Sequence, residues 1–137
     1  MHKDQAESVL DRLHDVQNRV YQGGDLAELR EVLRPDIEWH VPGDNAIAGD
    51  YHGLDDVLAY MQRRRELAAA TMRMYPRDLL VGDGNQVAVL TDATATIGGI
   101  DHAWSTVGLY RIDEHRIAAC WLLPLDPIAF DGVWATP

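Results

Sequence analysis

The chain has 137 residues, of which 47% are hydrophobic and 25% charged, and this predicts one soluble globular domain over residues 1–137. Its 22 acidic and 12 basic residues give a formal net charge of −10, which argues against a nucleic-acid partner because phosphate binding needs clustered cations. No apolar run approaches the roughly 20 residues that cross a bilayer, so no membrane partner is expected. The N-terminus lacks the apolar stretch of a signal peptide, and a cytoplasmic location is therefore expected.

The first segment is helical in pattern. Apolar residues spaced by three and four, with charges between them, predict an amphipathic helix from about Asp4 to Gln22. Gly23-Gly24 ends this helix. Asp25 can cap a second, shorter helix, which Pro35 stops.

A strand follows, because Ile37, Trp39 and Val41 alternate with polar residues. Period two places these three side chains on one face and His40 on the other. A twist or bulge at Pro42-Gly43 could still turn His40 inward.

The next segment contains three glycines up to Gly53 and is predicted to be a loop with a short strand or bulge. A third helix is predicted from about Leu54 to Ala70, with an apolar stripe along it. We interpret its Arg63-Arg64-Arg65 run, which Glu66 follows, as a solvated helix face rather than a binding patch.

The second half changes to strand patterns separated by turns rich in Gly and Asp. Pro76 marks an edge or a bulge in the first of these strands. The predicted strands cover residues 71–81, 86–97, 102–112 and 116–123. Helices followed by a meander predict an α+β fold, with an antiparallel sheet packed on three helices.

Several segments together resemble the SnoaL-like group of the nuclear-transport-factor-2-like superfamily, which also holds the ketosteroid isomerases. They are Gly24-Asp25, the sequence PDIEWHVPG at 35–43, AGDYHG at 48–53, and YRIDE at 110–114. The resemblance implies a cone-shaped barrel, in which a curved mixed or antiparallel sheet wraps the long N-terminal helix around a deep apolar pocket. It also implies that dimers are common, so we expect a homodimer.

The resemblance does not carry over the known catalytic residues. Val41, Gln17 and Gly108 fall where the ketosteroid isomerases have a base Asp, a Tyr and a protonated Asp. Trp121 matches a Trp that precedes the base of SnoaL-type cyclases, and Asp126 is the nearest Asp after it. No Arg was found to complete the Asp-Arg-Asp relay of limonene-epoxide-hydrolase-type enzymes.

Four residues are candidates for proton transfer: His102, Asp92, His40 and Asp126. His102 shares a strand face with Trp104, which the resemblance turns toward the pocket, but His102 also lies close to a hairpin end where it would be solvated. Asp92 would have a raised pKa if it faced the pocket, but its neighbours favour the outer face slightly. His40 alternates off the core face, and Asp126 could act from the pocket rim.

A set of aromatic, sulfur-containing and small side chains is a candidate wall for a flat hydrophobic ligand. Its members are Trp39, Trp104, Tyr110, Tyr21, Met61, Met74, Val41 and Thr106. Each of them alone is better explained as an ordinary core residue. Trp121 alternates out of phase with Cys120 and Leu122 and is a candidate for a dimer interface.

The sequence shows no pattern typical of a metal site or of a covalent nucleophile. The six histidines show no paired spacing and Cys120 is the only cysteine, so we predict no metal, no cofactor and no disulfide. Cys120 lies in an apolar run, which favours a buried inert thiol over a nucleophile.

Three functional hypotheses remain. The first is a cofactor-independent enzyme that moves protons on a small hydrophobic metabolite, for example a polyketide-like one, by isomerisation, cyclisation or dehydration. His102 or Asp92 would be its base, and His40 or Tyr110 its donor. The second is a binding protein of the same shape, and the third is a dimerisation module. The polar groups of the pocket distinguish the enzyme hypothesis from the binding-protein hypothesis. An enzyme needs a buried titratable group beside the ligand, whereas a carrier needs only one polar group that anchors the ligand.

Overall fold

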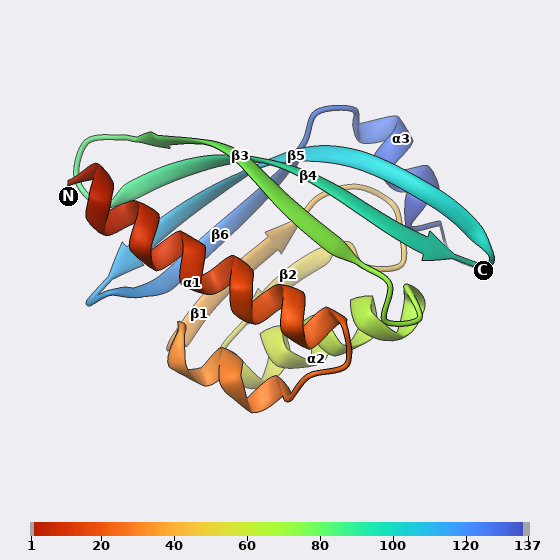
Figure 1. Ribbon diagram of the computed structural model, residues 1–137, viewed down its shortest axis with the longest axis horizontal. Coiled ribbons are helices and arrows are strands. Elements are labelled where there is room, and N and C mark those ends of the chain that lie inside the picture. The colour runs from red at the N-terminus through yellow and green to blue at the C-terminus, as the bar shows by residue number, and fades with distance from the viewer. Residues whose placement is uncertain (1, 136–137) are drawn as a thin grey trace.

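The computed structural model describes residues 2–135 and has an α+β architecture (Figure 1). In chain order the elements are α1 (Lys3–Tyr21), the 3-10 helix η1 (Leu26–Glu31), β1 (Leu33–Val41), β2 (Gly49–His52), α2 (Leu54–Leu67), β3 (Arg73–Val81), β4 (Gln86–Ile97), β5 (Ile100–Asp113), β6 (Arg116–Pro124) and α3 (Pro127–Val133). The predicted α+β class is therefore confirmed.

The six strands form one mixed sheet in the order β2-β1-β6-β5-β4-β3. The four strands of the second half make the predicted antiparallel meander. β1 adds to this meander by pairing parallel to β6, and β2 pairs antiparallel to β1. The parallel pair is the only reason that the sheet is mixed rather than antiparallel among the described strands.

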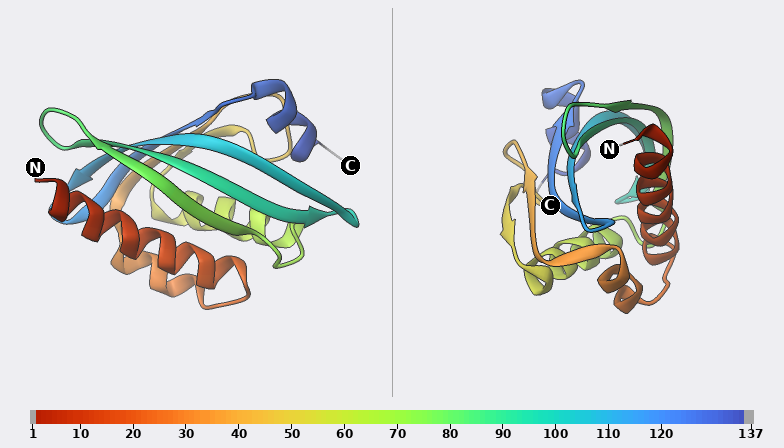
Figure 2. Two further views of the ribbon diagram at one scale, coloured as in Figure 1. Left: turned by 45° about the horizontal axis from the view of Figure 1, so that its top comes forward. Right: turned by 90° about the vertical axis from the view of Figure 1, so that its left-hand side faces the viewer.

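The sheet is strongly curved, and α1 and α2 cover its concave side (Figure 2). The long helix α1 lies against the edge strand β3, where Asn18 binds the backbone of Met74 in both directions. The amide of Asn18 donates to the Met74 carbonyl at 3.0 Å, and its oxygen accepts from the Met74 N–H at 2.9 Å. One side chain therefore joins the helix to a strand edge that would otherwise be open.

The predicted short helix after Asp25 is present as a 3-10 helix, and the Asp25 side chain caps it by accepting from the Ala27 N–H. The start of the following strand was predicted too late. β1 begins at Leu33, because the Ile117 N–H donates to the Val32 carbonyl and Leu33 already pairs with Ile117. The helix α3 was not predicted. It has only seven residues, too few for a periodic signal, although Asp126 caps it and Pro127 stands at its start.

The helix α3 closes one end of the concave side by binding the loop of residues 42–48. Asp131 accepts from the Asn45 amide at 2.7 Å and from the Asp44 N–H at 3.2 Å. The Ala46 N–H donates to the Trp134 carbonyl at 2.8 Å. The indole of Trp134 is thereby held inside, edge-on against Trp104 at 5.5 Å between ring centroids.

Candidate functional site

A small cavity lies on the concave side of the sheet, between α1, α2 and the central strands. Its volume is about 20 Å³, enough for about one water molecule. Its lining is Gln17, Trp39, Arg64, Met72, Met74, Thr91, Ala93, Trp104, Thr106, Tyr110 and Leu122. We call this space the inner cavity.

The alternation of β5 supplies one wall of the inner cavity. Trp104, Thr106 and Tyr110 lie two or four residues apart on one face of the strand, as period two requires. Gly108 falls between them, and a Cβ atom there would stand 2.7 Å from the Tyr110 hydroxyl and 2.6 Å from its ring. The glycine therefore makes room for the Tyr110 phenol over its own backbone.

Arg64 reaches the inner cavity from α2. It continues a buried stripe that Val57, Tyr60 and Met61 begin one and two turns earlier, and only 3% of its surface is exposed. Its Nη1 donates to the Tyr60 hydroxyl at 2.6 Å. The guanidinium carbon lies 5.2 Å from the ring centroid of Tyr21, 5.3 Å from that of Tyr60 and 5.8 Å from that of Trp134. The cation is thus held in a cage of aromatic rings.

No carboxylate forms an ion pair with Arg64 among the residues that the structure describes. An arginine stays protonated inside a protein, so the charge cannot be removed by a pKa shift. Burying one ion costs several kcal/mol, whereas each cation–π contact returns roughly 0.5–2 kcal/mol. The site therefore carries a positive charge that its aromatic neighbours only partly stabilise.

The neighbouring phenols and thiol do not supply an anion at neutral pH. Burial raises the pKa of Tyr60 far above its usual range, and it also raises the pKa of Tyr21 and of Tyr110. Burial likewise raises the pKa of the Cys120 thiol, which agrees with the inert buried cysteine expected from the sequence. All four groups remain neutral, and the charge of the inner cavity stays at that of Arg64.

Three residues that line the inner cavity each have a buried polar atom without a hydrogen-bond partner in the described part of the chain. These atoms are Arg64 Nε, Trp39 Nε1 and Gln17 Oε1. Two of them are donors and one is an acceptor. An unsatisfied buried polar group costs about 1–3 kcal/mol, so their concentration at one place calls for an explanation.

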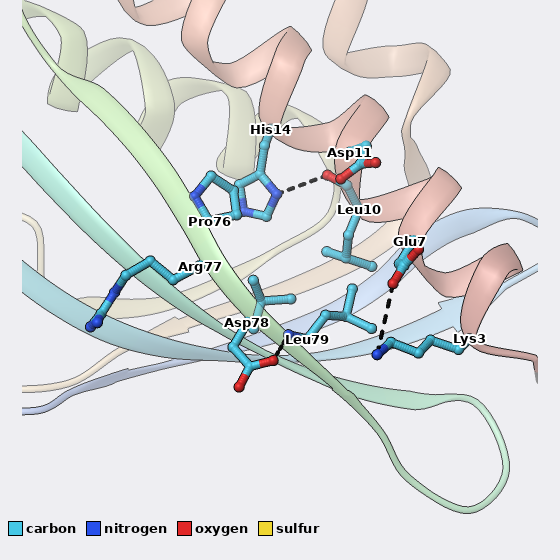
Figure 3. Close-up of a pocket in the computed structure, with 10 residues that line it drawn as sticks. Lys3, Glu7, Leu10, Asp11, His14, Pro76, Arg77, Asp78 and Leu79 are labelled. Atoms are coloured by element: carbon cyan, nitrogen blue, oxygen red, sulfur yellow. Dashed lines mark hydrogen bonds and ion pairs between the residues drawn. The ribbon is translucent and has the colours of Figure 1, made fainter.

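A second, more open space of about 330 Å³ lies along α1, between this helix and β3 (Figure 3). It lies where β3 bulges between Pro76 and Asp78, and Lys3, Glu7 and Asp11 stand along it on the helix. His14 also lines this outer groove, and its ring packs edge-on against Tyr110 at 6.3 Å between centroids. Tyr110 lines the inner cavity, so this ring contact links the lining of the outer groove to that of the inner cavity.

The protonation of His14 is fixed by its surroundings. Its Nδ1 lies 2.8 Å from the Leu10 carbonyl, and since a carbonyl only accepts, Nδ1 carries the hydrogen. Nε2 is buried and has no partner among the described residues. Burial lowers the pKa of His14, against the raising effects of the Leu10 carbonyl and of Asp11 and Asp15. His14 is therefore a neutral imidazole at pH 7 with a bare lone pair on Nε2.

The structure places most of the proposed wall residues around the inner cavity. Those that line it are Trp39, Trp104, Tyr110, Met74 and Thr106. Tyr21, Met61 and Val41 are buried in the core but are not part of the lining. Tyr21 still contributes indirectly, as one ring of the cage around Arg64.

The proposed proton-transfer residues lie elsewhere. His40 is on the outer face of the sheet, where its Nδ1 is 2.7 Å from Asp50 and its ring stacks on Trp121 at 5.4 Å. As the alternation predicts, His40 faces away from the core. β1 keeps this alternation through Val41, and the alternative of an inward turn at Pro42-Gly43 does not occur.

Asp92 also faces outward, and its two oxygens are occupied. One accepts from the Ser105 hydroxyl at 2.6 Å and the other lies 2.7 Å from Arg77 Nε. Asp126 caps α3 by accepting from the Ala129 N–H at 3.1 Å. His102 is half-buried opposite Ala95, one pleat beyond Trp104, and does not line the inner cavity. None of the four is brought to the cavity.

Comparison with known proteins agrees with this architecture. The SnoaL-like domain family matches residues 15–120. The chain belongs to the SnoaL-like family. The Mycobacterium tuberculosis (strain ATCC 25618 / H37Rv) protein Rv0034 is 33% identical over 113 residues, which is 82% of this chain and 86% of that protein.

Two solved structures illustrate the shared fold. Bal32a, from a soil-derived mobile gene cassette, has a TM-score of 0.82 at 23% identity, over 95% of this chain and 98% of its own. TerC, co-crystallised with polyporic acid, has a TM-score of 0.73 at 18% identity, over 92% of this chain and 94% of its own. The cone-shaped fold that the resemblance implied is confirmed.

Sequence reasoning missed Arg64, Met72 and His14. The Arg63-Arg64-Arg65 run was interpreted as one solvated face, yet the spacing of Val57, Met61 and Arg64 by four and three already places the middle arginine on the buried stripe. The same signal exists for His14, which follows Leu10 by four residues on the buried side of α1.

In the described residues, no three His, Cys, Asp or Glu side chains gather as a metal site would require. No described helix is long and apolar enough to cross a membrane.

Proposed function

We propose that this SnoaL-like protein binds a small, mainly apolar organic molecule in the inner cavity. The observation that carries the proposal is the set of three unpartnered polar atoms on an otherwise aromatic and aliphatic lining. Small-molecule sites combine apolar walls with a few convergent polar groups in this way. The co-crystallisation of the similarly folded TerC with polyporic acid is consistent with such a role.

Binding requires the inner cavity to enlarge, because about 20 Å³ holds no organic ligand. Met72 and Met74 line the cavity and have long, unbranched side chains that can change rotamer cheaply. The outer groove at the bulge of β3 offers further space, and its His14 contacts Tyr110 of the inner cavity. We therefore expect the ligand to displace the two methionines and to extend toward His14.

The four tryptophans give a direct test by NMR. With 2-naphthoate and 2-naphthamide as probes, the indole N–H signal of Trp39 should shift, since its Nε1 is buried at the cavity without a partner. The indole signal of Trp121, on the outer face, is the internal control and should stay in place. If neither probe moves Trp39 at millimolar concentration, or if Trp121 alone responds, the proposed site is wrong.

Acid/base catalysis is the second candidate function, and His14 is the observation that favours it. A neutral imidazole with a fixed tautomer and a free Nε2 is a suitable general base. The cation of Arg64 would stabilise an enolate formed by removal of a proton next to a carbonyl. This would make the protein a cofactor-independent isomerase, cyclase or dehydratase, with His14 as the base in place of the predicted His102 or Asp92.

Deuterium exchange of an activated ketone distinguishes a ligand-carrier function from acid/base catalysis. With 2-tetralone in D₂O, a catalyst should speed the loss of the α-proton signal, and His14→Gln should remove most of that acceleration. His102→Gln is the matched control, because His102 lines neither the inner cavity nor the outer groove. A wild-type rate equal to that of buffer, with the probes of the preceding experiment bound, would leave a carrier function alone.

Homodimer formation remains a proposal, supported by the outer face of the sheet. Trp121 is partly exposed there and Leu123, on the same strand face, is 47% exposed. We propose that this face joins two copies. Light scattering should give twice the chain mass, and Leu123→Glu should give the monomer; a wild-type monomer at 100 μM would refute the dimer.

A further inference from the structure

Arg64 differs from its two neighbours in the same arginine run. Arg63 donates from Nε to the Ala46 carbonyl at 3.0 Å. Arg65 donates from Nη1 to the carbonyls of Gly24 at 2.8 Å and Val20 at 3.2 Å, which ties α2 to the end of α1. Both have structural hydrogen bonds to backbone, whereas the Tyr60 hydroxyl is the only hydrogen-bond partner of Arg64 among the described residues.

Arg64 has no anionic partner. The chain has 22 acidic residues, yet none forms an ion pair with Arg64 in the part of the chain that the structure describes. The unpartnered Arg64 Nε and Trp39 Nε1 are both donors. The two donors and the positive charge can bind an oxyanion, and the aromatic walls can pack against a flat apolar ligand that bears it.

We infer that the ligand of the inner cavity is an aromatic or polyunsaturated monoanion, a carboxylate or an ionised enol, whose charge is neutralised by Arg64. This inference rests on the proposed binding function and names the chemical class that the site would take. One cation in a closed apolar space matches one negative charge, whereas a phosphate-like dianion would leave an uncompensated charge away from water. The aromatic cage then positions the cation, and the unpartnered acceptor Gln17 Oε1 is free for a hydroxyl of the ligand.

Charge dependence of binding is the first test. By titration calorimetry, 2-naphthoate should bind wild type about 10- to 100-fold more tightly than 2-naphthamide, which has nearly the same shape without the charge. Arg64→Met should abolish this preference and leave the amide within about threefold of its wild-type affinity. Equal affinities of the two probes for the wild type would overturn the inference, while the binding function itself would stand.

The second test does not depend on the choice of probe. If Arg64 serves to bind an anion, its charge does not stabilise the ligand-free fold. The double substitution Arg64→Met with Tyr60→Phe should then leave the melting temperature unchanged or raise it. Arg65→Met is the matched control, and it should lower the melting temperature because the Gly24 carbonyl loses its donor and the tie between α2 and the end of α1 is lost. A loss in the double variant as large as that in Arg65→Met would make Arg64 a structural residue and overturn the inference, whether or not the probes bind.

Discussion

The two faces of the curved sheet treat charge in opposite ways. On the outer face, Asp92 lies 2.7 Å from Arg77 and Asp50 lies 2.7 Å from His40, so each carboxylate has a partner and is open to solvent. On the concave face, Arg64 is buried among aromatic rings, and no carboxylate of the described residues pairs with it. Paired surface charges contribute little to stability and do not indicate a functional site. A buried charge without a partner is costly, and this is why we place the proposed ligand at Arg64.

The largest effect should come from the wall of the inner cavity. Trp39→Ala removes a side chain that is 1% exposed and packs against Tyr60 and Tyr110. It should lower the free energy of unfolding by about 3–5 kcal/mol, measured by urea denaturation. Trp121→Ala on the outer face is the control and should cost about 1 kcal/mol. Similar losses at both sites would remove the contrast between the faces.

Gly108→Ala should have the next largest effect. The new methyl group would meet the ring of Tyr110, which is 3% exposed and would have to shift within the core. Overpacking of this kind costs about 1–3 kcal/mol. In the double variant with Tyr110→Leu, which removes the clash, Gly108→Ala should cost much less; an unchanged cost would show that the strain lies in the backbone.

How far the sequence predicts this molecule differs between fold and site. Period two in β1 correctly put Trp39 inward and His40 outward, and the Val- and Thr-rich pattern predicted β4 to the residue. The site was predicted less well, because helical spacing was not applied to the polar residues Arg64 and His14. The pairing of Asp92 with Arg77 could not be foreseen, since it depends on the register between β3 and β4 and on the bulge after Pro76.

A smaller, pH-dependent effect should come from His14. Its pKa is lowered in the folded protein, so below pH 6.5, the usual value, the unfolded chain binds the proton more readily than the folded chain. The contribution of neutral His14 to the free energy of unfolding is therefore fully present above that pH. It is lost as the pH falls, by at most about 1.4 kcal/mol per pH unit. Between pH 7 and 5, urea denaturation should show a smaller loss for His14→Gln than for the wild type; parallel losses would mean that the imidazole is accessible to water.

The smallest effect should come from the outer ion pair. Asp92→Asn leaves the Ser105 hydroxyl a partner and removes only the charge that faces Arg77. We expect a change of about 0–1 kcal/mol in unfolding free energy, which 1 M NaCl should reduce further. The affinity for 2-naphthoate should not change, and a large loss of affinity would place Asp92 in the site after all.

The most direct test of the central claim is a crystal structure of the protein with 2-naphthoate. The account predicts the naphthalene ring between Trp39, Trp104 and the displaced side chains of Met72 and Met74, with a carboxylate oxygen within about 3.2 Å of an Arg64 guanidinium nitrogen. A probe that occupies the inner cavity with its carboxylate directed away from Arg64, or one found only in the outer groove, would contradict it.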